Sequence, residues 1–148
     1  MKLQLAKNPH CPIDVLEALA KDENEIVRLW VALNPNTTLN TLEALAKDEN
    51  EYVRCSVAQS PNTSSKTLKL LARSKNWVVR CAVAESPSTP PKSLETLAKD
   101  KDWGVRYLVA KNPNTPQKTL ELLARDEHVY VRRILCSYRK LSNSTKNP

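Results

Sequence analysis

The stretch that decides the fold runs from Val105 to Asp126 and reads VRYLVAKNPNTPQKTLELLARD. Its elements recur along the chain at intervals of 26 residues, as one set of prolines shows: Pro9, Pro35, Pro61, Pro87 and Pro113. A Val-Arg pair and a Leu-Ala pair recur at the same interval. A fixed period of roughly 20–50 residues predicts a solenoid, whose units bury their apolar faces only against neighbouring units.

The composition fits a single domain. The chain has 148 residues, of which 41% are hydrophobic and 26% charged, with no Phe and a single Gly, Gly104. Sheet-rich proteins need more glycine in their turns, so this composition favours helices. The sequence has no apolar run of about 18 residues and no signal-peptide core, so we expect a cytoplasmic protein. The formal charge of +7 makes nucleic acid a candidate partner without establishing it.

Each unit is predicted to contain two short helices. In the unit that starts at Thr89, this threonine is a candidate N-cap and Pro90 suits the first helical position. Leu94, Leu97 and Ala98 follow at helical spacing and define a first helix of about nine residues. Both helices are too short to be stable alone, so docking against adjacent units must stabilise them.

The second helix of each unit is predicted to begin after a polar N-cap, supplied by Asn24, Asn50, Asn76 and Asp102. It carries two apolar residues four positions apart, such as Val79 and Val83, which form one buried stripe. The helix should end before the next Asn-Pro or Ser-Pro, because proline disfavours the α conformation in the preceding residue.

The repeats predict one domain over residues 1–140, followed by a polar C-terminal tail over residues 141–148. Leu3, Leu5 and Ala6 match Leu29, Val31 and Ala32, so the chain begins partway through a second helix and five helix pairs follow. A start within a unit suggests a piece of a longer array. The pattern breaks after Cys136, where Tyr138-Arg139 replaces Asn-Pro.

This arrangement resembles the leucine-rich repeat variant family, whose units read roughly Val-Arg-x-x-Val-Ala-x-Asn-Pro-x-x-Pro-x-x-x-Leu-x-x-Leu-Ala-x-Asp. Val105–Asp126 matches nearly residue for residue, and the resemblance covers about residues 3–137. It implies an all-α, right-handed α-solenoid of five 26-residue units with an N-terminal half unit, in which the second helix is a short α-helix or a 3₁₀ helix. It also implies a non-enzymatic binding scaffold. The cysteine cluster that holds an iron–sulfur centre in some members is missing, so we expect no cofactor.

The pattern is also similar to HEAT repeats, in which a corner Asp and a second-helix Arg pair between neighbouring units. This resemblance implies a structural ladder made of Asp22, Arg28, Asp48, Arg54, Arg80, Asp100, Arg106, Asp126 and Arg132. Ser74 stands where the third unit would carry its Asp, and it interrupts the column.

The units differ most at the corner between the two helices. Glu25 and Glu51 show that one position there tolerates a charge, yet the next two units place Trp77 and Trp103 in it. The nearby acid also changes to lysine in those two units. We call the predicted partner-binding residues the corner patch: Trp77, Trp103, Tyr107, Lys75, Lys101, Arg73 and Lys111.

Three interpretations of the corner patch remain open. Trp, Tyr and Arg are typical hot-spot residues, so a protein or peptide partner is the favoured hypothesis. Nucleic acid is the alternative, because bases stack on aromatic rings and Lys or Arg follow phosphates. In the third interpretation, the two indoles only cap the junction between units.

Catalytic and metal sites find little support in the sequence. It contains no Gly-rich phosphate loop, no Ser/Cys–His pair and no ligand-spaced His/Cys set, so we expect neither an enzyme nor a metal site. Some DNA glycosylases are built from HEAT-like repeats and use Trp, Asp and Arg. Asp102, Trp103 and Arg106 could be interpreted in that way, but five short units leave little room to enclose a base.

Overall fold

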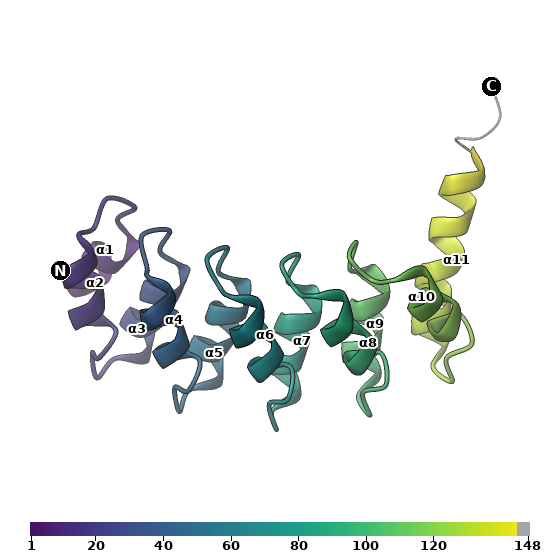
Figure 1. Cartoon of the computed structure of the whole chain (residues 1–148), viewed down its shortest axis with the longest axis horizontal. Helices are drawn as coiled ribbons and strands as arrows, with labels where there is room; N and C mark the ends of the chain where they lie inside the picture. The colour runs from purple at the N-terminus through teal and green to yellow at the C-terminus, as the bar shows by residue number, and fades with distance from the viewer. Residues whose placement is uncertain (145–148) are drawn as a thin grey trace.

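The computed structural model describes the backbone of residues 1–144 and the side chains of residues 1–136. Within that range the chain forms helices α1 to α11 and no strand (Figure 1). Their bounds are α1 Lys2–Lys7, α2 Ile13–Leu19, α3 Glu25–Leu33, α4 Leu39–Leu45, α5 Glu51–Gln59, α6 Ser65–Leu71, α7 Trp77–Glu85, α8 Pro91–Leu97, α9 Trp103–Lys111, α10 Gln117–Leu123 and α11 Val129–Ser144. No helix in the described part of the chain is both long and apolar enough to cross a membrane.

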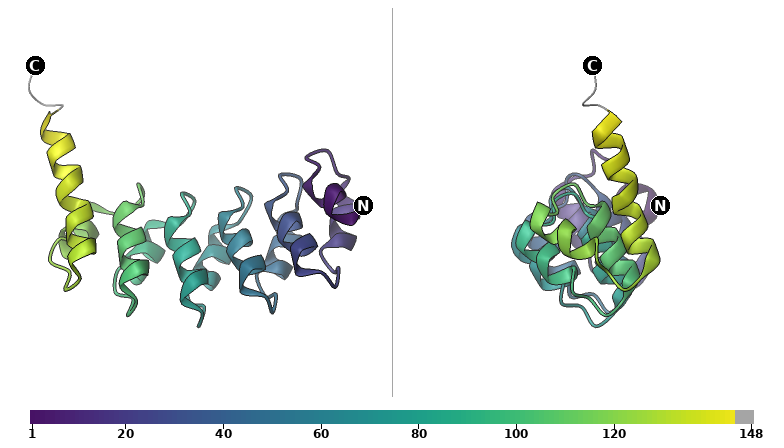
Figure 2. Two further views of the ribbon diagram at one scale, coloured as in Figure 1. Left: turned by 180° about the vertical axis from the view of Figure 1, so that it is seen from behind. Right: turned by 90° about the vertical axis from the view of Figure 1, so that its right-hand side faces the viewer.

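The helices form an α-solenoid of two layers. The odd-numbered helices pack against one another from α1 to α11, while each even-numbered helix mainly contacts the odd-numbered helices beside it in sequence. Figures 1 and 2 show the pairs stacked along one axis, with each unit repeating the orientation of its neighbour. Both helices of each unit are α-helices, so the 3₁₀ alternative for the second helix was wrong.

The core lies between the layers and continues through every unit. The second helices contribute fully buried valines such as Val53, Val57 and Val79, and the first helices contribute leucines such as Leu68 and Leu94. These are the apolar positions that the repeat pattern predicts. These side chains pack between adjacent units, so the apolar face of one unit is buried only when the next unit is present.

The first helix begins one residue later than predicted, and the threonine before it has another role. Thr38 and Ser64 are N-caps, and Pro90 takes that position in the fourth unit. The buried hydroxyl of Thr89 instead donates to the Val83 carbonyl oxygen, 2.6 Å away. Threonine therefore caps the C-terminus of the preceding second helix, where a carbonyl lacks a helical partner.

The N-caps predicted for the second helices are confirmed. The side-chain oxygens of Asn24, Asn76 and Asp102 each accept from the backbone N–H two residues later, at 2.8 Å. Asn50 does the same for Tyr52. These bonds satisfy donors that a helix N-terminus would otherwise leave unpaired.

The last helix departs from the prediction of a tail over residues 141–148. α11 continues through residue 144, and Figure 1 shows its end projecting beyond the stack. The missing Asn-Pro explains this length, because no proline stops the helix. Residues 145–148 lie outside the described residues. Cys136 stands in the column that holds Ala32, Ala58, Ala84 and Ala110 in the other units, and it is exposed.

Arginines and aspartates form rungs between neighbouring units. The Arg28 guanidinium donates from Nε and Nη2 to the two carboxylate oxygens of Asp48, at 2.7 and 3.0 Å. The same fork joins Arg80 to Asp100 and Arg106 to Asp126. A rung also forms at the first corner, where Lys2 occupies the arginine column and lies 2.7 Å from Asp22.

Each ladder arginine also binds the corner of its own unit. Nη1 of Arg28 donates to the carbonyl oxygens of Asp22 and Glu23. Arg54 and Arg132 make the equivalent carbonyl bonds, but no described carboxylate pairs with them. Ser74 explains the missing rung at Arg54, and no described unit follows Arg132 to supply an aspartate.

Asparagines join neighbouring units on the opposite edge of the solenoid. The Asn36 amide donates to the Pro9 carbonyl oxygen at 2.8 Å, and Asn62 donates to Pro35 at 2.6 Å. Asn114 likewise donates to Pro87. The prolines therefore stop one helix and present a free carbonyl to the next unit, a connection that the sequence pattern did not identify.

The rungs predict a defined pH dependence of stability. Burial raises the pKa of Asp100, but the hydrogen bonds from Arg80 and from the Asp102 N–H outweigh it and hold the pKa below its ordinary value of 3.8. A carboxylate with a lowered pKa in the folded state stabilises the fold fully above 3.8. That contribution is lost as the pH falls through the folded-state value.

We expect Asp100→Asn to lower the free energy of unfolding by about 1–3 kcal/mol at neutral pH, because one charge-assisted rung is lost. The difference from the wild type should shrink as the pH falls below 3.8. Urea denaturation over a pH series measures both effects. Glu95→Gln, an exposed change in the same unit, is the matched control and should be nearly neutral. A pH-independent difference would contradict the ionic origin of the rung.

Candidate functional site

Trp77 and Trp103 each occupy the first position of a second helix, directly after the N-cap. This position points away from the core, and the indoles are 52% and 43% exposed. The corresponding Glu25 is exposed and Glu51 is half-buried. About half of each indole is thus exposed, although Trp103 also contacts a ring of the next unit across the junction.

The two tryptophans border a shallow hollow of about 370 Å³ on the side formed by α7, α9 and α11. We call this the aromatic hollow, and its lining residues are Trp77, Cys81, Trp103, Gly104, Tyr107, Leu108 and Tyr130. Burial raises the pKa of the Cys81 thiol to about 11, so this cysteine stays neutral and behaves as a small apolar residue.

Gly104 opens the floor of the aromatic hollow. The other units carry a side chain at this position, namely Ile26, Tyr52, Val78 and Tyr130. A Cβ atom at Gly104 would lie 2.9 Å from Oδ1 of Asp102, the N-cap of α9. Gly104 therefore keeps this position of the hollow free of a side chain, and a larger residue there would require the Asp102 cap to shift.

Two ring-bearing residues of the last unit belong to this surface, although the sequence analysis did not include them. The His128 ring stacks on Trp103 with centroids 4.2 Å apart and planes 6° from parallel. Tyr130 is 53% exposed and its ring lies 5.8 Å from that of Trp103. The sequence could have pointed to these residues through a change of residue type in two columns of the repeat. His128, for example, stands where the other units have an Asn or Asp N-cap.

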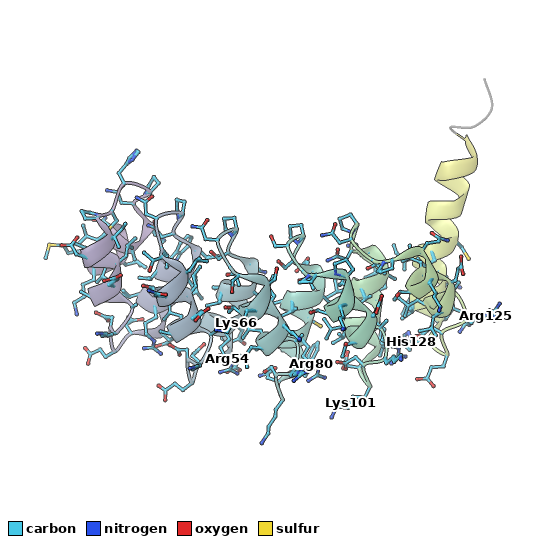
Figure 3. All side chains as sticks on the ribbon, in the orientation of Figure 1. Arg54, Lys66, Arg80, Lys101, Arg125 and His128 are labelled. Carbon is cyan, nitrogen blue, oxygen red and sulfur yellow. The ribbon has the colours of Figure 1, made fainter. Side chains whose placement is uncertain are left out.

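The cations of the corner patch are divided between two surfaces. Lys75 and Lys101 are exposed at the corners beside the tryptophans, and Figure 3 shows Lys101 on the same edge as Arg80 and His128. Lys111 lies over the Tyr107 ring, with Nζ 5.8 Å from the centroid. Arg73 does not line the aromatic hollow and borders a groove between the first helices instead.

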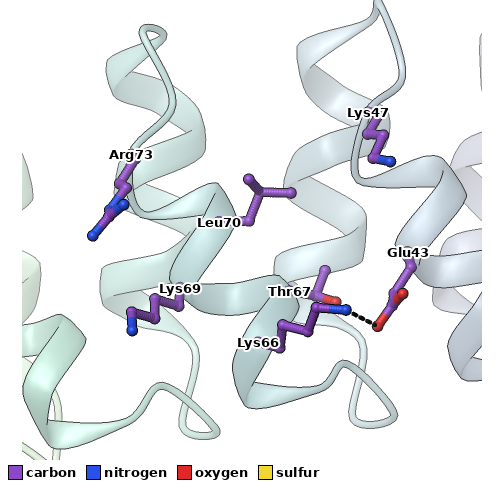
Figure 4. A pocket seen from close by; sticks show the side chains of 7 residues that line it. All are labelled: Glu43, Lys47, Lys66, Thr67, Lys69, Leu70 and Arg73. Carbon is purple, nitrogen blue, oxygen red and sulfur yellow. Dashed lines mark ion pairs between the residues drawn. The ribbon is translucent and has the colours of Figure 1, made fainter.

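That groove lies between α4 and α6, and its volume is about 320 Å³ (Figure 4). Its lining residues are Glu43, Lys47, Lys66, Thr67, Lys69, Leu70 and Arg73. Lys66 pairs with Glu43 across the groove at 3.7 Å. The structure therefore separates Arg73 from the aromatic side chains that the sequence analysis placed with it.

The polar groups around Trp103 have structural partners. Asp102 caps α9 by accepting from the Gly104 N–H, and Arg106 is held by Asp126 and by Glu127. The two polar residues of the glycosylase-like interpretation, Asp102 and Arg106, are thus engaged in the fold. No group of three His, Cys, Asp or Glu side chains in the described residues is close enough together to hold a metal ion.

Comparisons with known proteins agree with this architecture. The family described as leucine rich repeat variant matches residues 103–128, the unit that contains much of the aromatic hollow. A solved structure described as a leucine-rich repeat variant with a novel repetitive protein structural motif matches with a TM-score of 0.68 and 30% sequence identity. The match covers 90% of this chain and 58% of that chain. No curated protein matches the sequence significantly.

The chain thus spans little more than half the length of the solved structure that it matches. The likeness nevertheless extends through 90% of this chain. The matched unit and the shared fold together show that this chain is an α-helical repeat protein similar to the leucine-rich repeat variant proteins.

Proposed function

We propose that this chain is a non-catalytic binding scaffold that takes a protein or peptide partner at the aromatic hollow. The observation that carries the proposal is the exposure of Trp77 and Trp103 at positions where the first two units have glutamate. Packing between units does not require aromatic side chains there. Large exposed aromatic groups around an open hollow are typical of binding surfaces.

The lining of the hollow indicates the chemistry of the partner. Trp77, Tyr107 and Tyr130 offer apolar faces, and Gly104 leaves room between them. Lys75 and Lys101 stand at the adjacent corners and are exposed. An apolar side chain seated in the hollow, with acidic residues beside it, would satisfy both features. Such a partner would gain apolar burial at the centre and charge complementarity at the rim.

Nucleic acid at the same surface is the second candidate, and the lysines beside an exposed indole favour it. A base could stack on Trp77, whereas one face of Trp103 already stacks on His128. The distinction between the two candidates lies in electrostatics, because phosphate contacts release counterions. Each phosphate contact makes log K fall by roughly 0.7–0.9 per unit of log salt concentration.

Exchange of each tryptophan for the glutamate of its sister units should be tolerated by the fold. We expect Trp77→Glu to change the free energy of unfolding by no more than about 0.5 kcal/mol, as is usual for exposed positions. Trp103→Glu should cost more, about 0.5–1.5 kcal/mol, because it loses the stack on His128. Urea denaturation measures both values. If Trp77→Glu instead unfolds the whole protein, Trp77 is a structural residue that caps the junction between units.

The same variants test the proposed site. Affinity capture from the native cells, after nuclease treatment, should retain a protein partner on the wild type and lose it on the Trp77→Glu/Trp103→Glu double variant. Gly104→Val, which carries the residue of the third unit, should weaken capture by filling the hollow. Leu122→Ala, an exposed apolar change on α10, is the control and should bind normally. A partner set that is identical for all four proteins would rule out the site.

If nucleic acid is the partner instead, capture should fail after nuclease treatment. Binding of single-stranded oligonucleotides should then weaken with salt at the slope given above. A slope near zero, or oligonucleotide binding that survives loss of both tryptophans, would remove nucleic acid as the partner of the aromatic hollow.

A further inference from the structure

The ladder lacks a carboxylate at one position, and the arginine at that position is otherwise held as in its sister units. Nη1 of Arg54 donates to the carbonyl oxygens of Asp48 and Glu49, at 2.5 and 2.9 Å. In the next unit, Nη1 of Arg80 binds the equivalent pair of carbonyls. The backbone of its own unit thus orients the Arg54 guanidinium as it orients that of Arg80.

The other half of the Arg54 guanidinium has no partner among the described residues. In Arg28, Arg80 and Arg106, Nε and Nη2 form a fork that binds both oxygens of an aspartate. Ser74 occupies the aspartate position opposite Arg54. A guanidinium fork matches an oxyanion with two accessible oxygens, either a carboxylate or a phosphate.

Ser74 keeps the local geometry of the aspartates that it replaces. Its Oγ accepts from the Asn76 N–H at 3.3 Å, as Oδ1 of Asp48 accepts from Asn50 and Oδ1 of Asp100 accepts from Asp102. Oγ of serine is bonded to Cβ, like Cγ of aspartate. A phosphorus atom on Oγ would therefore carry its oxygens onward in the direction of the missing carboxylate.

The charges near Ser74 in the sequence also favour an anion. It stands between two exposed cations, Arg73 and Lys75. At the equivalent corner of the second unit, Asp48 stands between Lys47 and Glu49. No glutamate adjoins Ser74, and the Arg54 fork lies opposite its position in the ladder. A phosphoserine carries a charge of roughly −1.5 to −2 near neutral pH and gains most from such a setting.

We propose that Ser74 is a phosphorylation site whose phosphate pairs with the Arg54 guanidinium and completes the ladder between the second and third units. The Ser74 hydroxyl oxygen attacks the terminal phosphorus of a nucleoside triphosphate bound to a protein kinase. The bond from that phosphorus to the bridging oxygen breaks, the nucleoside diphosphate leaves, and the hydroxyl proton passes to the base of the kinase. This proposal is independent of the partner at the aromatic hollow.

The phosphate should act on the junction between α5 and α7. Solenoid stability depends on terms for each interface between units, so the interface without a rung is locally weakened. A pair between the Ser74 phosphate and Arg54 links the third corner to the second unit, and we expect it to reduce local opening there. The third corner leads directly into Trp77, so the modification also fixes one wall of the aromatic hollow.

The test places phosphoserine at position 74 by genetic encoding and compares thermal unfolding in Arg54 and Arg54→Gln backgrounds. Phosphoserine should raise the midpoint by roughly 2–4 °C in the Arg54 background and by much less with glutamine. Ser74→Asp should raise it in the same Arg54-dependent way. Phosphoserine at the exposed Ser88, on the opposite edge, is the control and should show no dependence on Arg54.

Arg54→Lys provides a second background in case the glutamine variant does not fold, because lysine keeps the charge but lacks the fork. A phosphoserine effect that is equal in the arginine, lysine and glutamine backgrounds would overturn the proposal. So would the absence of any effect at position 74. Stabilisation of the unmodified chain by millimolar inorganic phosphate, without an effect of phosphoserine, would assign the fork to a free anion instead. Hydrogen exchange of α5 and α7 should slow on phosphorylation and supplies a readout at the junction itself.

Discussion

In three of the five described helix pairs, the guanidinium of the second helix joins three parts of the chain at once. In Arg80 it binds two carbonyls of its own corner through Nη1, and it binds the aspartate of the following corner through Nε and Nη2. One side chain thereby fixes the turn between the two helices and sets that turn against the next unit. Because the helices are too short to persist alone, this connection and the Val and Leu core must form together.

A corner fixed in this way can carry different surface residues without a change of fold. The exposed position after the N-cap holds Glu25, Glu51, Trp77, Trp103 and Val129 on nearly the same backbone. The scaffold thus separates two requirements that compete in compact domains, namely packing and recognition. The same separation makes sister units into internal controls at this position, since both glutamate and tryptophan occur there on the same scaffold.

The aromatic hollow depends on how the repeat units pack together, which the sequence positions of its residues do not show. Trp77, Trp103 and Tyr130 come from three successive units, and only the regular stacking of α7, α9 and α11 brings them to one surface. Repeat columns identified the two tryptophans and Tyr107. They missed His128 and Tyr130, because each belongs to a different column from the tryptophans, and they did not show that Arg73 borders the groove beside α6.

The sequence alone determined the unit length, the two helices of each unit, the N-caps of the second helices and the core positions. These features depend on local propensity and on spacing along one chain, and the recurrence of the same residues in five units makes them visible. Tertiary structure decided the features that depend on distances between units. It assigned threonine to the end of the preceding helix, joined the Asn36 amide to the Pro9 carbonyl oxygen and stacked His128 on Trp103. Each of those outcomes depends on where a neighbouring unit places its atoms, which periodicity along the chain does not specify.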